Sequence, residues 1–100
     1  MDVLQVIAEP RRREILNLVW TEEKAASEIA SEFDVTFGAV SQHLSILREA
    51  RLVSMRKDGN RRLYQADQEA LGPYRAILEA MWSDTLQQLS ETIEAENQDG

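Results

Sequence analysis

The segment from Phe37 to Ala50 constrains the fold of this chain more than any other part. Val40, Leu44 and Leu47 recur at steps of four and three, so they line one side of a helix. At about 100° per residue, the residues that point away from this side are small or hydrogen-bonding, whereas a solvated helix usually carries Lys and Glu there. They are Gly38, Gln42, Ser45 and Glu49, with Ser41 and Arg48 on the flank. Such a face suits a helix pressed into a polar groove, although Ser and Gln also occur on ordinary surfaces.

A shorter helix is expected just before this segment. Its apolar positions have helical spacing and are Ala26, Ile29, Ala30 and Phe33. Asp34–Val35 is then a tight connection, because Asp tolerates the left-handed backbone conformation better than most residues. Thr36 is suited to cap the next helix. The sequence therefore predicts a helix, a tight turn and a second helix.

A β-hairpin is predicted after Leu52. Apolar and polar residues alternate on both sides of Asp58–Gly59–Asn60, which is typical of two antiparallel strands joined by a turn. Four cations lie at the tip and on the two arms: Arg56, Lys57, Arg61 and Arg62. Cations this close repel one another and cost stability unless an anion neutralises them. A phosphate backbone would supply that anion, and the alternative is a solvated surface.

The first part of the chain is expected to be helical as well. Residues 3–8 have helical spacing, and Pro10 can begin a second helix as its first residue. The first turn of that helix is Arg11–Arg13, which is unusual because the positive end of the helix dipole favours carboxylates. The three arginines indicate either a functional site or a solvated end balanced by Glu9 and Glu14.

The last helix is predicted over residues 73–95. Asp67 can cap a short turn through Leu71, Gly72 ends that turn, and Pro73 opens the helix. An apolar stripe follows it for roughly five turns and consists of Tyr74, Ile77, Leu78, Met81, Trp82, Leu86, Leu89 and Ile93. A chain of 100 residues is too small to cover this whole stripe, so a second copy is expected to cover it. Residues 1–96 then form one domain, and residues 97–100 form a polar tail.

Charge is segregated along the chain. The formal net charge is −7, yet residues 36–65 carry six cations against two carboxylates. Ionic contacts depend on the local charge within about 8 Å, so one basic face can bind a polyanion although the whole chain is acidic. No apolar run approaches the roughly 20 residues that span a bilayer, and we expect a cytoplasmic protein that contacts no membrane.

The residue types that catalysis needs do not occur together. The chain has no cysteine and a single histidine, His43, and no paired carboxylates, activated Ser or Lys, or Gly-rich phosphate loop accompany it. We therefore expect neither an enzyme nor a cofactor. For His43 we expect a packing role beside the buried stripe, with DNA contact or metal ligation as alternatives. Trp20 and Trp82 are expected in the core or at a dimer interface.

The order of these elements is that of a winged helix-turn-helix, a mostly α fold with a small β-hairpin. The helix of residues 37–50 would enter the major groove of duplex DNA, where Gln42 can bond adenine in bidentate fashion and the cations can hold phosphates. The predicted DNA-binding residues are Thr36, Gly38, Ser41, Gln42, Ser45, Arg48, Arg56, Lys57, Arg61, Arg62 and Arg12. The alternative is a dimeric winged-helix module that binds a protein and does not bind DNA directly.

Several stretches of the sequence are shared with a known family. They are Ala8-Glu9-Pro10-Arg11-Arg12-Arg13-Glu14-Ile15-Leu16, Glu28-Ile29-Ala30, Val40-Ser41-Gln42-His43-Leu44, Leu47-Arg48-Glu49-Ala50 and Asp58-Gly59-Asn60-Arg61-Arg62-Leu63-Tyr64. On these stretches, and from about Val6 to Leu89, the chain resembles the ArsR/SmtB family of bacterial winged-helix repressors. Residues 63–67 and 79–82 look like a metal-independent branch associated with genes for SRPBCC-type proteins.

This resemblance implies a homodimer that binds an inverted-repeat operator in double-stranded DNA and represses transcription. The dimer would be built from the first and last helices. The residues at its interface would be Val3, Leu4, Ile7, Tyr74, Ile77, Leu78, Met81, Trp82, Leu86 and Leu89. Whether an inducer exists is left open.

The chain also departs from the family pattern. Residues 24–28 contain no cysteine where sensors of thiophilic metals carry one, and Asp84, Glu91 and Glu94 on the last helix have no histidine near them. Carboxylates alone make a poor zinc site, so we expect no metal. Arg51 and Asp34 stand where glycines are common, and a left-handed conformation at Arg51 would cost about 1 kcal/mol.

Overall fold

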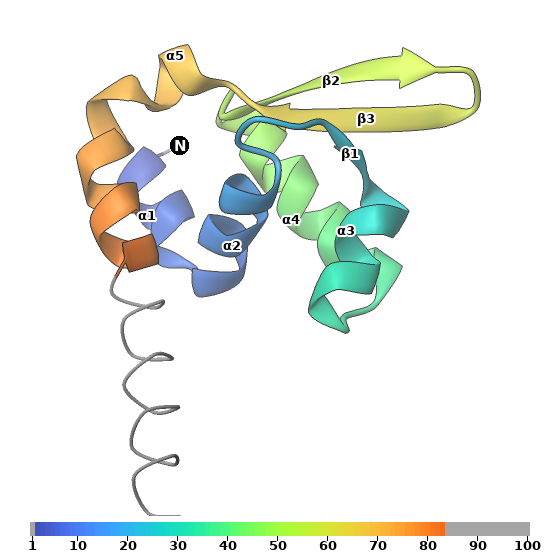
Figure 1. Cartoon of the computed structure of the whole chain (residues 1–100), viewed down its shortest axis with the longest axis horizontal. Helices are drawn as coiled ribbons and strands as arrows, with labels where there is room; N and C mark the ends of the chain where they lie inside the picture. Colours follow the sequence, from blue (N-terminus) through green and yellow to red (C-terminus); the bar gives the residue numbers. More distant parts are fainter. Residues whose placement is uncertain (1, 84–100) are drawn as a thin grey trace, which may run out of the picture.

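The computed structural model describes residues 2–83. The elements are α1 (Val3–Ala8), α2 (Pro10–Leu18), β1 (Lys24–Ala25), α3 (Ala26–Phe33), α4 (Phe37–Glu49), β2 (Val53–Asp58), β3 (Arg61–Ala66), α5 (Gln68–Leu71) and the 3-10 turn η1 (Gly72–Tyr74). Residues 75–83 follow as helix. In Figure 1 the β2–β3 hairpin extends from one end of the molecule, while α1, α2 and the last described helix lie together at the other. The predictions that concern Leu86, Leu89 and the polar tail lie outside the described residues.

The pair α3 and α4 forms the helix-turn-helix. Asp34 ends α3 in the left-handed conformation, with a φ of 52°, as its residue type predicts. Oγ1 of Thr36 accepts a hydrogen bond from the backbone N–H of Ala39 at 3.1 Å and so caps α4. These two residues set where α3 stops and where α4 begins.

The core is apolar throughout. Val40, Leu44 and Leu47 of α4 are buried, which confirms the stripe predicted from their spacing. They belong to one cluster with residues of α1, α2, α3 and the last described helix, including Ile15 and Ile29. No polar or charged side chain among residues 2–83 is buried. Because the stripe on α4 faces this cluster, the opposite face of α4 has to point outward.

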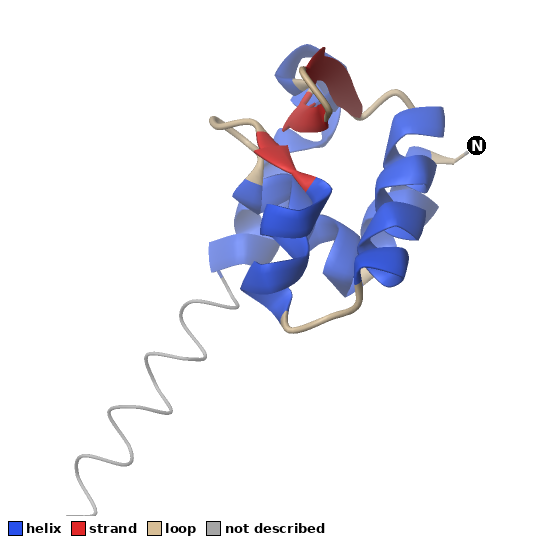
Figure 2. Ribbon diagram, turned by 90° about the vertical axis from the view of Figure 1, so that its right-hand side faces the viewer, coloured by secondary structure: helices blue, strands red, loops and turns tan. Residues whose placement is uncertain are grey.

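A three-stranded antiparallel sheet takes the strand order β1-β3-β2. Figure 2 shows its strands gathered at one end of the helical body. The hairpin turns through Gly59 and Asn60, and Gly59 has a φ of 64°, which glycine adopts without steric cost. The sequence predicts this hairpin but not β1, because two residues are too few to show alternation.

Two backbone hydrogen bonds hold the base of the hairpin, one to the residue that ends α2 and one between the residues that flank its two strands. The N–H of Ala66 donates to the carbonyl of Val19 at 2.9 Å, and the N–H of Asp67 donates to the carbonyl of Leu52 at 2.9 Å. The hairpin therefore leaves the body at a defined angle, although its tip is exposed.

The passage into the last helix differs from its prediction. Asp67 does cap α5, since its Oδ1 accepts a hydrogen bond from the N–H of Ala70 at 3.0 Å. Helix α5 ends at Leu71 with Gly72 as its C-cap, as predicted, but Gly72 keeps right-handed helical angles (φ −48°, ψ −49°) and leads directly into another turn. Gly72–Tyr74 forms a 3-10 turn, so α-helical structure resumes at residue 75 rather than at Pro73. A single 3-10 turn accommodates Pro73 because the proline falls in its first turn.

Two tryptophans attach this last helix to α2. The rings of Trp20 and Trp82 pack edge to face, with their centroids 5.5 Å apart. Nε1 of Trp82 donates a hydrogen bond to the carbonyl of Arg13 at 3.1 Å. Both rings pack against the core cluster, as expected from the sequence.

Candidate nucleic-acid interface

The outer face of α4 is open to solvent. Every residue predicted to contact DNA on this helix and its cap is exposed, namely Thr36, Gly38, Ser41, Gln42, Ser45 and Arg48. Hydroxyl and amide groups both donate and accept hydrogen bonds, so this face can match mixed patterns of donors and acceptors. Within the described part of the chain no carboxylate pairs with Arg48.

The C-terminal end of α4 carries the backbone strain anticipated from its sequence. Arg51 has a φ of 63°, in the left-handed region that disfavours side chains with a Cβ. The N–H of Leu52 donates to the carbonyl of Leu47 at 2.9 Å, and the N–H of Arg51 donates to the carbonyl of Arg48 at 3.0 Å. These two bonds satisfy carbonyls at the end of α4 and turn the chain into β2.

The β2–β3 hairpin, which we call the wing, carries four cations, and two of them pair with carboxylates. Arg56 donates through Nε to both carboxylate oxygens of Glu23, at 2.9 and 2.8 Å, and also through Nη2. Nη2 of Arg61 lies 2.5 Å from Oε1 of Glu28. The hydrogen bonds from Arg56 hold the pKa of the Glu23 carboxyl below its ordinary value, and Glu23 in turn raises the pKa of Arg56. Local sequence patterns do not indicate these pairs, because the two members of each lie 33 positions apart.

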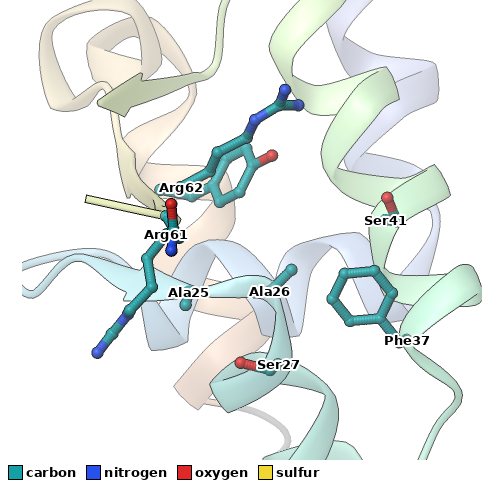
Figure 3. Close-up of a pocket in the computed structure, with 9 residues that line it drawn as sticks. Ala25, Ala26, Ser27, Phe37, Ser41, Arg61 and Arg62 are labelled. Carbon is teal, nitrogen blue, oxygen red and sulfur yellow. The ribbon is translucent and has the colours of Figure 1, made fainter. Parts of the chain in front are cut away.

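A hollow of about 390 Å³ separates the wing from the start of α4. It is lined by Ala25, Ala26, Ser27, Phe37, Ser41, Asn60, Arg61, Arg62 and Tyr64. In Figure 3 the ring of Phe37 points from α4 toward the hollow, while the side chains of Arg61 and Arg62 leave β3 in opposite directions. Phe37, a residue with no predicted role, is 59% exposed and lines this hollow together with Ser41.

The arginines at the start of α2 are used inside the protomer. Nε of Arg12 donates to the carbonyl of Val6 at 2.8 Å, and Nη1 of Arg13 donates to the carbonyls of Ile7 and Ala8 at 3.0 and 2.8 Å. These carbonyls end α1, where they have no partner within the helix and where the dipole favours cations. The arginines that look misplaced on α2 therefore cap the preceding helix. Arg12 is half-buried, unlike the other predicted DNA-binding residues.

His43 lies on the flank of α4, as its position in the sequence predicts. Its Nδ1 is 3.5 Å from Nη1 of Arg12. Burial lowers the pKa of His43 from its ordinary value of 6.5, and the positive charge of Arg12 lowers this pKa further. The imidazole is therefore predominantly neutral near pH 7.

An exposed apolar surface lies on α1 and the last described helix. Leu4 is 51% exposed, Ile77 42% and Met81 36%, while Val3, Tyr74 and Trp82 are half-buried. Two further residues predicted at a dimer interface are placed differently, because Ile7 is 2% and Leu78 0% exposed within one protomer. Both belong to the protomer's own core cluster.

Residues 2–83 also bear on metal binding and on membrane insertion. No three His, Cys, Asp or Glu side chains of this region gather in a way that could hold a metal ion. None of its helices is long and apolar enough to cross a membrane.

The fold and this surface define a winged helix-turn-helix protein. The model for bacterial regulatory proteins of the arsR family matches residues 9–55. The HTH-type transcriptional regulator Rv2034 of Mycobacterium tuberculosis is 37% identical over 95 residues, which cover 95% of this chain and 89% of that protein. The chain therefore belongs to the arsR family and is a transcriptional regulator.

Solved structures have the same architecture. The crystal structure of a possible transcriptional regulator for arsenical resistance matches with a TM-score of 0.71 at 40% identity, covering 90% of this chain and 94% of that one. The homodimeric winged helix-turn-helix DNA-binding domain Mb0332 of Mycobacterium bovis, a possible ArsR-family regulator, also gives 0.71, at 27% identity and with coverage of 82% and 76%. These matches confirm the fold class predicted from the sequence.

Proposed function

We propose that two copies of this chain bind one DNA duplex at an inverted repeat and repress transcription there. The observation that carries this proposal is the exposed outer face of α4, which is free of carboxylates until Glu49 and lies beside a cationic wing. The major groove of DNA is about 12 Å wide and admits one helix of this kind. Occupation of an operator by such a dimer would block transcription.

The residues of α4 and the wing have different roles in this proposal. Gln42 reads a base edge, because its amide can both donate to and accept from adenine. Thr36, Gly38, Ser41 and Ser45 face base edges or the flanking phosphates. Arg48 and the wing cations bind phosphates, and they set affinity and register more than sequence preference. Arg12 is omitted, because its guanidinium faces Val6 and His43.

A second copy would cover the exposed apolar surface. Leu4, Ile77 and Met81 supply its most exposed apolar side chains, and a patch of this kind is typical of an interface. A twofold axis through the surface would place two α4 helices about 34 Å apart, one turn of the duplex. The homodimeric state named for the Mycobacterium bovis domain supports this arrangement.

We further propose that the protein works in the cytoplasm without a bound metal. The absence of cysteine, the ligand that thiophilic metals prefer, supports the second part of this proposal. Release from DNA would then depend on a small molecule, on a partner protein or on the concentration of the regulator itself.

Genome-wide footprinting followed by titration tests the proposed function. We expect protected sites with inverted repeats, and an affinity for them that falls steeply between about 50 and 200 mM salt as counterions are released. A dimer that binds only a protein through apolar contacts would respond little to salt. Absence of protected sites together with no salt-dependent binding to any duplex would overturn the proposal.

A further inference from the structure

The register of the wing sorts its four cations into two pairs. Lys57 lies opposite Arg62, and Asp58 lies opposite Arg61. Because neighbouring side chains on a strand point to opposite faces, Arg56 and Arg61 share one face of the wing while Lys57 and Arg62 share the other. Figure 3 shows the guanidinium groups of Arg61 and Arg62 on opposite sides of β3.

The face that carries Arg56 and Arg61 is tied to the helix-turn-helix. Glu23, which precedes β1, binds the Arg56 guanidinium through both carboxylate oxygens. Oε1 of Glu28, in the first turn of α3, accepts from Arg61 at 2.5 Å and from the backbone N–H of Ala25 at 3.0 Å. Glu23 precedes β1 and Glu28 belongs to α3, so these ion pairs join the wing to the start of the helix-turn-helix.

The opposite face is available to a ligand. Within residues 2–83, no carboxylate pairs with Lys57 or Arg62. Lys57, Arg61 and Arg62 all line a second hollow at the wing tip, of about 230 Å³. Arg61 and Arg62 also line the larger hollow whose other wall includes Phe37 and Ser41 of α4, but of these two arginines it is Arg61 that pairs with Glu28. The side chain of Arg62 leaves β3 on the side opposite to Arg61 (Figure 3), and it adjoins the outer face of α4 across this hollow.

We propose that the wing is one-sided: Lys57 and Arg62 contact the phosphate backbone of the duplex, whereas Arg56 and Arg61 are positioning residues that Glu23 and Glu28 hold away from it. This inference rests on the proposed function, and it narrows the set of wing cations that contact DNA. The two ion pairs orient the wing so that its free cations face the same duplex as α4.

Neighbouring arginines provide a matched test. Arg62→Gln and Arg61→Gln each remove one exposed charge from β3, and the salt dependence of duplex binding is measured for both and for the unchanged protein. Each lost phosphate contact reduces the slope of log K against log salt concentration by about 0.9. We expect that reduction for Arg62→Gln and for Lys57→Gln. The slope should be unchanged for Arg61→Gln and for Arg56→Gln. Equal loss of slope in Arg62→Gln and Arg61→Gln, or in Lys57→Gln and Arg56→Gln, would overturn the inference.

A second variant tests whether Glu23 positions Arg56 or only keeps it from binding phosphate. In Glu23→Gln, Arg56 loses its ionic partner, and we expect weaker duplex binding, by about two- to fivefold, at an unchanged slope. Tighter binding with a steeper slope would show that Arg56 reaches phosphate once it is released, and would overturn the inference. Thermal unfolding of each variant verifies that the fold is kept. Failure of the unchanged protein to bind any duplex at low salt would instead overturn the proposed function, which is a different result from equal slopes.

Discussion

Arg12 connects the end of α1 to α4, because its Nε donates to the carbonyl of Val6 at 2.8 Å while its Nη1 lies 3.5 Å from Nδ1 of His43. Arginine only donates hydrogen bonds, so His43 can accept at Nδ1 only as the neutral tautomer with its proton on Nε2. The same guanidinium thus satisfies an unpaired carbonyl of α1 and favours neutral His43. Helix α1 carries part of the proposed dimer surface and α4 the proposed DNA face, so Arg12 lies between the helices that carry the two surfaces.

Replacement of Arg12 by alanine should destabilise the fold without changing the salt dependence of DNA binding. The carbonyl of Val6 loses its charged donor, and we expect the free energy of unfolding to fall by about 1–2 kcal/mol in chemical denaturation. Arg48→Ala is the control, since Arg48 is exposed and pairs with no carboxylate in the described part of the chain. It should alter stability by less than about 0.5 kcal/mol. A reduced salt slope in Arg12→Ala would return Arg12 to the DNA interface.

Arg51→Gly should stabilise the protein. Arg51 has a φ of 63°, which a residue with a Cβ adopts at a cost and glycine does not. We expect a gain of roughly 1 kcal/mol in the free energy of unfolding. Gly59→Ala is the converse control, because Gly59 has a φ of 64° and a Cβ there would meet no atom within 4 Å. That variant should lose a similar amount, and changes of the same sign in both would contradict the role assigned to backbone strain.

Stability should depend on the protonation of His43. Burial and Arg12 lower its pKa below 6.5, Arg11 acts in the same direction, and Glu9 opposes them. Just below pH 6.5, His43 binds a proton in the unfolded chain but not in the folded chain. The free energy of unfolding therefore falls as the pH drops through this range. Denaturation measured between about pH 5 and pH 7 should show this loss in the unchanged protein and a smaller one in His43→Gln. Identical pH profiles for the two proteins would show that His43 does not cause the loss of stability.

Gln42→Ala should change sequence preference more than general affinity for DNA. Loss of a bidentate contact reduces discrimination at one base pair by about 1–3 kcal/mol and leaves binding to unrelated duplexes nearly unchanged. Arg48→Ala serves as the comparison, since a phosphate contact should weaken binding to all duplexes alike. Competition between an operator and single-base variants of it measures the difference. A uniform loss across all duplexes in Gln42→Ala would contradict base reading by this residue.

Ile77→Glu should weaken association of the two copies. Ile77 is 42% exposed on the last described helix, and a carboxylate there would be desolvated at an apolar interface. We expect the dimer to dissociate at concentrations where the unchanged protein remains paired, as measured by light scattering. Thr21→Glu adds the same charge at an exposed site between α2 and β1 and should leave the association unchanged. Equal masses for the two variants would place the interface elsewhere.

The parts of this structure that depend on neighbours in sequence could be predicted, and those that depend on distant partners could not. The burial of Val40 and Leu44, the cap at Thr36 and the left-handed Asp34 follow from local spacing and residue type. The partners of Arg56 and Arg61 are each 33 positions away, and periodicity reports which side of an element is buried, not which residue it meets.

Two other features that the sequence did not predict also depend on residues distant in the chain. Strand β1 exists because Lys24 and Ala25 pair with β3, and its own two residues carry no signal. The arginines on α2 are unfavourable for their own helix dipole, as predicted, but the carbonyls that accept their hydrogen bonds belong to the end of α1. The unfavourable position in the helix dipole singled out these residues, but neither interpretation drawn from it, a functional site or a solvated end, anticipated the hydrogen bonds of Arg12 and Arg13.

Sedimentation equilibrium of the protein with and without a duplex recovered by footprinting tests the central claim most directly. The account predicts two chains of 11.4 kDa in each free particle and two on each duplex, bound to half-sites about 34 Å apart. A protein that sediments as a single chain, or a duplex whose mass is unchanged by added protein at low salt, would contradict it.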